Sequence, residues 1–371
     1  MTRPVVQINT KASWYGGEYQ VLKLVEGLVS SGCETLLLAH GAGALFRRAR
    51  AARLPVVALP PPLCQRWFPA GRLMVRRLLA RHDPLVIHAH DSRAVVLSPR
   101  TIGHRLVPLI LSRRVPSPFR PSPLSPGRYS ADRIAAIVAV STSVKDVLVA
   151  GGVAPDRVRV VPSGTDIREL DAAVPDPALS RRSGGRLIVG GVGELTQKKN
   201  WAMFVRVAAE IRRRGLDLWW TIAGEGPERR RLEELARRLG VAGEVHLAGF
   251  RDDVESFTKG LDILFHTSRA EGTPGAVRMA MLAGVPVVAV NTCGTIETLG
   301  GCGLTVGLDD DRAAAGAIER LARDAALRAR VAAEASAYSR ARFDVGAMVA
   351  GTVRVYEDVL GGALPCRQNT P

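Results

Sequence analysis

Short apolar runs alternate with longer amphipathic stretches along almost the whole chain, and this alternation limits the fold more than any other feature. In the first half, the runs at residues 5–8 and 35–39 are each followed by a stretch with helical spacing of its apolar residues. The same order returns in the second half, after residues 187–192 and 218–223. Strands that are apolar throughout and separated by helices indicate a parallel sheet covered on both faces. The sequence therefore predicts an α/β fold with parallel sheets.

A break in this alternation near residues 166–185 divides the chain into two parts. Proline, glycine and charged residues replace the apolar runs there, as is typical of a boundary between domains. A chain of 371 residues also has the length of two ordinary domains. We expect a first domain over residues 1–166, a second over 167–344, a helix over 345–360 and a disordered tail over 361–371.

Composition argues against several classes of protein. The chain has no uninterrupted run of about 18 apolar residues, so no membrane-spanning helix is expected, and its first residues lack the apolar core of a signal peptide. Its five cysteines are odd in number and scattered, and no Cys or His cluster has the spacing of a metal site. These features predict free thiols in a reducing cytoplasm, with neither a metal nor another cofactor.

Positive charge is concentrated in the first part of the chain. Residues 1–166 contain 23 Lys and Arg against 9 Asp and Glu, whereas residues 167–371 contain 28 against 26. The excess favours an anionic partner, such as a phosphorylated acceptor or an anionic membrane surface. Nucleic acid also fits the charge, but no recognition motif or aromatic platform supports it. A genome that favours Arg and Ala would produce the same total charge without any such partner.

Residues 63–82 form a strongly basic predicted helix. Five Arg residues alternate there with Leu, Met and Val, next to Trp67 and Phe68. Such a helix is able to lie on an anionic membrane. An ordinary surface helix that packs its apolar face on the sheet has the same pattern, so both interpretations stay open.

Polar residues collect where several predicted strands end. Gly16 and Gly17 follow the first strand, and His88, His90 and Asp91 lie at the end of a later one. Ligands of open parallel sheets bind at the carboxyl ends of the strands. Each of these residues also has an ordinary role in a turn or cap, but their collection at several strand ends favours a binding site.

The stretch at residues 268–289 combines a carboxylate with a helix start. Glu271 follows an apolar run, and Thr273 and Pro274 fit the N-cap and the first position of a helix. A helix N-terminus attracts an anion such as phosphate, whereas a carboxylate accepts hydrogen bonds from hydroxyl groups. Lys199 precedes another predicted helix and adds an ammonium that can pair with a phosphate. A nucleotide-sugar presents both a diphosphate and hydroxyl groups.

Several segments, taken in order, resemble one protein family. They are the Gly16-Gly17 loop, VIHAHDSRA at residues 86–94, and residues 128–166, 223–254 and 262–297, the last of which begins DILFHTSRAEGTPGAV. Together they are similar to the family 4 glycosyltransferases, from about residue 5 to about residue 360. The resemblance implies the GT-B fold, in which two Rossmann-like domains lie face to face with the active site in the cleft, and in which the final helix crosses back to the first domain. It also implies a retaining enzyme that uses a nucleotide-diphosphate sugar.

The resemblance also assigns roles to individual residues. Lys199 would hold the diphosphate, Glu271 would contact hydroxyls of the donor sugar, and His90 would lie near the reacting carbon or the donor sugar; these three are the candidate catalytic residues. The donor-binding candidates are Gly16, Gly17, Gly224, Phe250, Arg251, Gly272, Thr273, Pro274 and Met279. The acceptor-side candidates are His88, Asp91, Arg113 and Arg114.

Two positions depart from the family pattern. Met279 stands where the family usually has a second Glu, eight positions after Glu271, and Glu194 stands where it usually has an Arg, five positions before Lys199. Loss of a charge-assisted phosphate contact would cost about 1.5–3 kcal/mol. These departures leave two hypotheses about function.

The first hypothesis is a glycosyltransferase that moves a sugar to a lipid-linked or lipopolysaccharide-type acceptor in the synthesis of cell-envelope polysaccharide. This enzyme would be cytoplasmic and peripheral on the inner face of the membrane. The second hypothesis is a degenerate GT-B protein that binds a glycan or a partner without catalysis.

Overall fold

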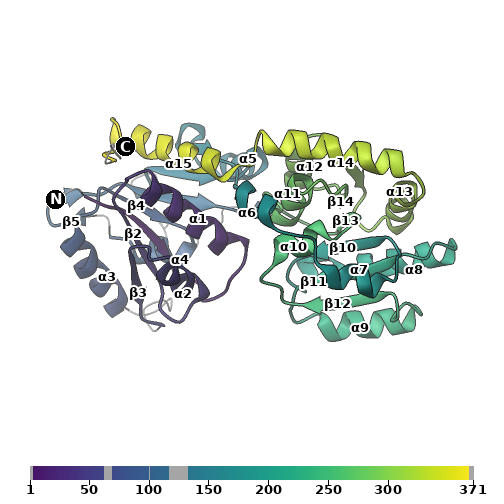
Figure 1. The fold of residues 1–371 in the computed structure, drawn as a ribbon. Coiled ribbons are helices and arrows are strands. Elements are labelled where there is room, and N and C mark those ends of the chain that lie inside the picture. The colour runs from purple at the N-terminus through teal and green to yellow at the C-terminus, as the bar shows by residue number, and fades with distance from the viewer. Residues whose placement is uncertain (1–2, 62–68, 100, 117–132, 367–371) are drawn as a thin grey trace. The chain divides into compact units, whose positions relative to one another are not determined.

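The chain folds into two compact units, each built on one parallel β-sheet. The computed structural model describes residues 3–61, 69–99, 101–116 and 133–366. Unit 1 contains Met1–Gly164 and Val345–Pro371, and unit 2 contains Thr165–Asp344 (Figure 1). The predicted fold class, with two Rossmann-like α/β units, is confirmed.

Unit 1 is built on a seven-stranded sheet whose recorded pairings are parallel. In spatial order its strands are β3 (Val56–Leu59), β2 (Thr35–His40), β1 (Val5–Asn9), β4 (Val86–Ala89), β7 (Leu109–Arg113), β8 (Ala136–Ala139) and β9 (Val158–Val160). A separate antiparallel pair is formed by β5 (Thr101–Ile102) and β6 (Arg105–Leu106). The central strands are buried from end to end, which explains why their sequences are apolar rather than alternating.

Helices cover both faces of this sheet. Core residues of α3 (Pro69–His82), α4 (Ser92–Leu97) and α5 (Thr142–Ala150) pack on one face, and those of α1 (Gly16–Ser30), α2 (Ala44–Ala51) and α15 (Val345–Leu360) pack on the other. A short 3-10 helix, Pro155–Arg157, precedes β9. Gly27 lets α1 and α15 approach closely, because a Cβ at this position would overlap the side chain of Val349.

The segment that follows α15 is joined covalently to the segment that follows α1. Cys33 and Cys366 form a disulfide across 333 positions of sequence, and Leu364 is buried in the core beneath α15. Two sequence predictions are therefore wrong. Cys33 and Cys366 are not free thiols, and residues 361–366 of the expected disordered tail are ordered, because the disulfide and the burial of Leu364 hold them against unit 1. Spacing could not reveal this pairing, since the two cysteines meet only after the helices have packed.

Unit 2 is built on a six-stranded parallel sheet. In spatial order its strands are β12 (Val245–Gly249), β11 (Trp219–Ala223), β10 (Ile188–Val192), β13 (Ile263–His266), β14 (Val287–Val290) and β15 (Leu304–Val306). The edge strand β15 is not among the strands that the sequence pattern predicts, because only three residues take part and two of them are not buried.

The helices of unit 2 also form two layers. Core residues of α8 (Trp201–Arg213), α9 (Arg229–Arg238) and α13 (Asp311–Arg323) pack on one face of the sheet. Those of α7 (Pro177–Ser183), α10 (Val254–Lys259), α11 (Gly275–Leu282) and α12 (Cys293–Leu299) pack on the other. The remaining helices are α6 (Ile167–Ala172), the 3-10 helix η3 (Gln197–Lys199) and α14 (Ala325–Arg340).

A buried aromatic cluster joins α8 to its sheet. The ring of Phe204 meets Trp201 and Trp220 edge to face, with centroids 5.7 and 5.1 Å apart, and stacks on Phe265 at 5.7 Å. Such pairs contribute about 0.5–1.5 kcal/mol each beyond the area that they bury. The cluster fixes α8, and with it the η3 turn that precedes α8.

Candidate functional site

The candidate residues fall into two groups, one in each unit, and each group lies where parallel strands end. In unit 2 they follow β10, β11, β12 and β13, and in unit 1 they follow β1, β4 and β7.

An ion pair between Lys199 and Glu271 forms the centre of the unit 2 group. Lys199 ends η3, after β10, and its Nζ lies 2.7 Å from Oε1 of Glu271, which follows β13. The side chains are 22% and 11% exposed, so the pair is half-buried. Lys198 is more peripheral: its Nζ lies 4.0 Å from Oε2 of Glu271, and its side chain is 46% exposed. The two loops are joined by hydrogen bonds from Thr267 Oγ1 to the backbone oxygen of Lys199 and from the backbone N–H of Arg269 to that of Lys198.

The cations around Glu271 keep its carboxylate ionised. Burial by itself would raise the pKa of Glu271, but Lys199, His266 and Lys198 outweigh burial and lower the pKa to about 2. For His266, burial first and Lys199 second lower the pKa to about 4, so this imidazole is neutral near pH 7 and is a cation only at the low pH at which Glu271 itself gains a proton. The loop thus holds a stable negative charge, and Lys199 supplies the positive charge beside it.

His266 and Ser268 form part of this group, although the sequence analysis did not single out either residue. Both are buried, and His266 Nε2 and Ser268 Oγ have no hydrogen-bond partner among the residues that the structure describes. Buried polar atoms in proteins usually have a partner, which is often an ordered water or a ligand. The sequence does carry a signal for them: His266 is the last residue of the otherwise apolar strand β13, and Ser268 lies two positions later.

The turn from Glu271 to Pro274 is held close to α12. A Cβ at Gly294 would overlap the backbone oxygens of Glu271 and Gly272, so only glycine permits this approach. Helix α11 begins at Gly275 with Pro274 as its N-cap, one residue later than predicted. Thr273 is therefore not the N-cap; the extended backbone of Pro274, with φ −67° and ψ 113°, delays the first helical residue. Gly284 follows α11 with φ 72°, as expected of the glycine that ends a helix.

Met279 lies one turn into α11 and points into an apolar cluster. It packs against a core that includes Leu170, Leu282 and Phe343, and its Sδ accepts a hydrogen bond from Thr258 Oγ1 at 3.6 Å. A carboxylate in this environment would lose hydration, whereas a methionine fits it. The apolar surroundings therefore account for Met279 at this position.

The other donor-binding candidates in unit 2 have structural partners. A Cβ at Gly224 would overlap the backbone of Gly193, so Gly224 allows two loops to cross after β10 and β11. The guanidinium of Arg251 is held by Asp176 at 2.8 Å and by Asp253 at 2.5 Å. Phe250, in contrast, has a largely exposed ring that is available to stack on a planar group.

In unit 1, Gly16 and Gly17 form the first turn of α1 instead of a loop before it. The helix starts early because the backbone N–H of Tyr15 donates to Glu18 Oε2 at 3.1 Å, which anchors the N-terminus. A Cβ at either glycine would meet nothing within 4 Å, so the space beside this helix start is open within unit 1.

The carboxylate of Asp91 is fully used inside unit 1. It caps α4 by accepting from the backbone N–H groups of Arg93 and Ala94, and it also accepts from the backbone and the hydroxyl of Thr10. These contacts fix the turn after β4, in which His90 lies. His88 and His90 are both buried, and the guanidinium of Arg114 contacts His90. Arg113 ends β7, where it is half-buried.

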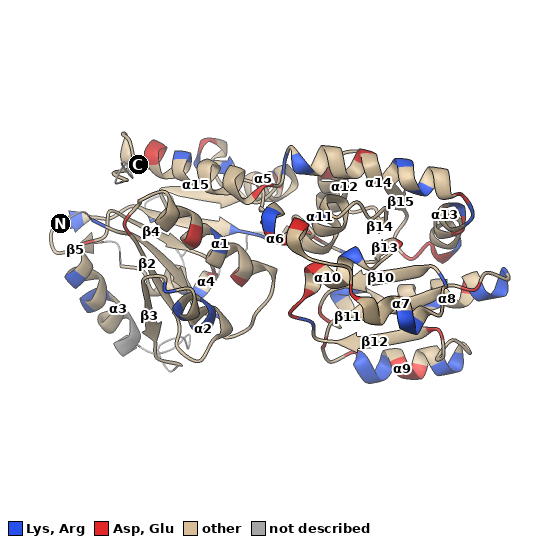
Figure 2. Cartoon of the chain, in the orientation of Figure 1, with Lys and Arg blue, Asp and Glu red and all other residues tan. Residues whose placement is uncertain are grey.

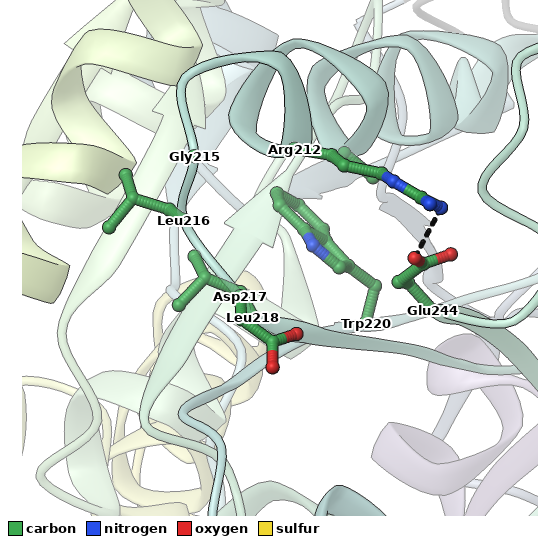
Figure 3. Close-up of a pocket in the computed structure, with 8 residues that line it drawn as sticks. Arg212, Gly215, Leu216, Asp217, Leu218, Trp220 and Glu244 are labelled. Carbon is green, nitrogen blue, oxygen red and sulfur yellow. Dashed lines mark hydrogen bonds and ion pairs between the residues drawn. The ribbon is translucent and has the colours of Figure 1, made fainter.

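A separate cavity of about 290 Å³ lies at the other end of the unit 2 sheet (Figure 3). Trp220 and the ion pair of Arg212 with Glu244 line it, together with the loop that leads into β11. It lies at the amino ends of the strands, whereas the Lys199–Glu271 pair lies at the carboxyl ends, so the two are distinct. Within the described ranges, no group of three His, Cys, Asp or Glu side chains is arranged to hold a metal ion.

Comparison with known proteins identifies the family of the chain. Residues 14–169 match the model "Glycosyltransferase Family 4", and residues 186–324 match "Glycosyl transferases group 1". The chain belongs to the family 4 glycosyltransferases. These two matches extend over both units, and each includes strand ends that carry candidate residues.

Individual relatives and structures agree with this family. The chain is 29% identical to 2-deoxystreptamine glucosyltransferase of Streptomyces kanamyceticus over 226 residues, which are 58% of this chain and 55% of the relative. It is 32% identical to the lipopolysaccharide core biosynthesis glycosyltransferase LpsE of Rhizobium meliloti (strain 1021) over 147 residues, which are 39% and 42% of the two chains. The chain thus spans about half the length of these relatives.

The fold is that of solved GT-B structures. The structure of Anabaena Alr3699/HepE in complex with UDP and glucose superimposes with a TM-score of 0.80 over 96% of this chain and 100% of the other, at 20% identity. This likeness confirms the GT-B fold predicted from the sequence.

Proposed function

We propose that this family 4 glycosyltransferase transfers a sugar from a nucleotide-diphosphate donor to a lipid-linked or lipopolysaccharide-type acceptor. The observation that carries the proposal is the half-buried pair of Lys199 with Glu271 at the carboxyl ends of β10 and β13. An ammonium and an ionised carboxylate 2.7 Å apart fit a ligand that has both a phosphate group and sugar hydroxyls.

Donor binding would divide the pair between two parts of the ligand. The ammonium of Lys199 would move from Glu271 to the diphosphate, and the carboxylate would then accept hydrogen bonds from sugar hydroxyls. As the bond between the sugar carbon and the diphosphate breaks, negative charge grows on the departing phosphate. A fixed ammonium stabilises that charge more than it stabilises the bound donor, and this difference lowers the barrier.

The nucleotide and the stereochemistry are finer parts of the proposal. UDP is supported as the nucleotide by the similar HepE structure, which was solved with UDP and glucose. Retention of the configuration at the sugar carbon rests on the family resemblance. The ring of Phe250, more than half exposed after β12, offers a stacking surface for the base.

An acceptor at an anionic membrane surface is supported by α3 and by one relative. No helix in the part of the chain that the structure describes is long and apolar enough to cross a membrane. Val75 and Leu79 pack α3 into the core, whereas Leu73 and Met74 are 49% and 43% exposed. Figure 2 shows basic residues and no acidic residue along α3. The predicted aromatic neighbours, Trp67 and Phe68, lie outside the described residues.

Exposed apolar side chains beside Arg76, Arg77 and Arg81 fit a surface of acidic lipid. The core glycosyltransferase LpsE supports an acceptor of the lipopolysaccharide type. The 2-deoxystreptamine glucosyltransferase supports a different acceptor, of the 2-deoxystreptamine type. We favour the lipid-linked acceptor because α3 presents a basic, partly apolar surface.

A second candidate function is binding without catalysis, and Met279 is the observation that favours it. The thioether of a methionine is only a weak acceptor, and that of Met279 already accepts from Thr258, so nucleotide affinity is expected to be lower than with a glutamate. Its apolar surroundings show that the position is well packed as it stands.

Turnover of nucleotide-sugars separates the two candidates. The protein is incubated with UDP-, GDP-, ADP- and TDP-sugars and with membrane extracts as acceptor, and released nucleotide is measured. Transfer is supported if nucleotide release requires the acceptor and disappears in Glu271→Gln. The control is Glu234→Gln, on the exposed face of α9, which is expected to retain turnover. Absence of release with every donor, or equal release by wild type and Glu271→Gln, overturns the proposal.

A further inference from the structure

Three polar side chains interrupt the apolar core on one face of the unit 1 sheet. Gln7 in β1, His88 in β4 and Ser112 in β7 lie on adjacent strands, and Gln7 and His88 are paired in register. Their neighbours on the same face are apolar residues that pack beneath α1 and α15. All three are buried, so each needs a partner inside the protein.

The partners form one continuous chain of hydrogen bonds with Tyr356 of α15 at its centre. Gln7 Nε2 lies 3.0 Å from Tyr356 Oη, which lies 2.7 Å from His88 Nδ1. His88 Nε2 then lies 2.8 Å from Ser112 Oγ. In the other direction, Gln7 Oε1 lies 2.7 Å from His90 Nε2, and His90 Nδ1 lies 3.1 Å from Arg114 Nη2.

Arg114 determines the direction of the bonds on its side of the chain. A guanidinium only donates, so His90 Nδ1 must accept. A neutral imidazole has one acceptor and one donor, so His90 Nε2 carries the proton and donates to Gln7 Oε1. The amide of Gln7 is thereby oriented with its NH₂ group toward Tyr356. In the opposite orientation the NH₂ group of Gln7 would face His90. Gln7 and Arg114 would then both donate to an imidazole that has a single lone pair with which to accept.

The remaining bonds follow from the hydroxyl of Tyr356. This hydroxyl accepts from Gln7 and is fully buried, so its own hydrogen must go to His88 Nδ1. His88 then carries its proton on Nε2 and donates to Ser112. The opposite tautomer of His88 would leave the Tyr356 hydrogen without an acceptor among the described residues. The guanidinium of Arg114 thus determines which group donates and which accepts in every hydrogen bond of the chain, as far as Ser112.

The charge states agree with this arrangement. Burial and then Arg114 lower the pKa of His88 to about 3. Burial, His88 and Arg114 hold the pKa of His90 well below its usual range. Burial also raises the pKa of Tyr356, so the phenol keeps its proton. The charged groups around Arg114 are Glu18 of α1 and Asp91 of the β4–α4 turn.

We propose that Arg114 and Tyr356 are positioning residues for His90: Arg114 decides which ring nitrogen carries the proton, and Tyr356, through Gln7, fixes where the ring points. His90 lies at the end of β4, where both of its ring nitrogens are occupied within unit 1. It therefore acts by its fixed position and not as a proton-transferring base. The importance of this positioning for sugar transfer rests on the proposed function, whereas the tautomer does not.

The tautomers can be measured by NMR on the full-length protein. Protonated and unprotonated imidazole nitrogens have well-separated ¹⁵N shifts, so ¹⁵N-histidine labelling reports the state of each ring. The seven histidines are assigned by single His→Gln substitutions. We expect His88 and His90 to appear as neutral rings with the proton on Nε2, unchanged between pH 7 and pH 5.5.

Substitutions test each positioning residue. Arg114→Met removes the donor to Nδ1, so His90 is expected to become a mixture of tautomers, whereas Arg114→Lys retains an N–H donor and the original shifts. Arg159→Met, which removes an exposed guanidinium of the same unit, serves as the control with unchanged shifts. Tyr356→Phe should change the His88 signals, because Nδ1 loses its donor. If Arg114→Met fails to fold, Arg114→Lys and Tyr356→Phe still test the assignment.

Four results would overturn the proposal. His90 protonated on Nδ1, or charged at pH 6, contradicts the role of Arg114, as do unchanged His90 shifts in a folded Arg114→Met protein. Unchanged His88 and His90 signals in Tyr356→Phe contradict the role of Tyr356. For turnover, Tyr356→Phe is expected to lower kcat by between about 2-fold and 10-fold at unchanged KM for the donor. If Tyr356→Phe changes the tautomers but keeps the kcat of the wild type, positioning of His90 does not serve catalysis.

Discussion

Replacing Lys199 by methionine would leave the Glu271 carboxylate half-buried beside only the weaker charge of Lys198. In the folded protein the pKa of Glu271 falls from 4.5 to about 2, and a difference of that size corresponds to about 3 kcal/mol of stability at pH 7. Because the folded pKa is the lower one, this stability is present above pH 4.5 and is lost as the pH falls toward 2. At pH 3 the unfolded chain is mostly protonated at this residue, and the contribution falls to roughly 1 kcal/mol.

We therefore expect Lys199→Met to destabilise unit 2 by about 2–3 kcal/mol at pH 7 and by roughly 1 kcal/mol at pH 3. The matched control is Lys198→Met, whose ammonium lies 4.0 Å from Glu271 on a side chain that is 46% exposed, so its cost should stay below about 1 kcal/mol. Denaturant unfolding followed by tryptophan fluorescence suits this test, since Trp201, Trp219 and Trp220 all lie in unit 2. Equal stability of the two variants at pH 7, or a Lys199→Met deficit that does not shrink at pH 3, would refute the reasoning.

Three further predictions concern the packing and the surfaces of the two units. Cys33→Ser removes the disulfide to Cys366 and should lower the stability of unit 1 by about 2–4 kcal/mol. Thermal unfolding of the variant and the wild type, with and without reductant, measures this loss; equal transition temperatures of the two proteins without reductant would contradict it. Gly294→Ala places a Cβ against the backbone of Glu271 and Gly272, so nucleotide-sugar turnover should fall at least tenfold while circular dichroism stays that of the wild type, and full turnover would argue against this contact. Leu73→Ser combined with Met74→Ser should weaken sedimentation with vesicles of acidic phospholipid about tenfold, whereas Leu106→Ser, on β6, should not. Equal sedimentation of all these proteins would contradict docking through α3.

The sequence predicted the sheets well because their strands are covered on both faces. Apolar runs such as those of β10 and β14 reflect this burial directly, because a run of four to six apolar residues between helices is typical of a buried strand. The edge strand β15 lacked the signal, since only one of its three residues is buried. The early start of α1 was also missed, because two glycines at a helix start resemble a loop.

The sequence predicted which residues belong to the candidate site, but it could not predict which of them contact one another. Lys199 and Glu271 are 72 positions apart, and only the packing of β10 beside β13 brings their loops together. The contact of Gly294 with the turn at Glu271 likewise depends on where α12 packs. Spacing cannot encode such contacts, because they are set by the order of strands in the sheet.

The hydrogen-bond chain of unit 1 left a weaker trace in the sequence. Gln7, His88 and Ser112 are buried polar residues inside mostly apolar strands, which is itself unusual. Tyr356, the partner of Gln7 and His88, is contributed by a helix at a sequence separation of 349 from Gln7. The polar residues could have been noticed, but their partner could not have been named.

Calorimetric titration of nucleoside diphosphates tests the central claim most directly, namely that the Lys199–Glu271 pair forms the binding site for the diphosphate of a nucleotide-sugar. UDP and GDP are titrated into the wild type, Lys199→Met and the control Glu234→Gln. We predict that the wild type and the control bind at least one of the two nucleotides, and that Lys199→Met binds it about 10- to 100-fold more weakly, as expected for loss of a charge-assisted contact. Lack of binding by the wild type, or equal affinity of Lys199→Met and the wild type, would contradict the claim.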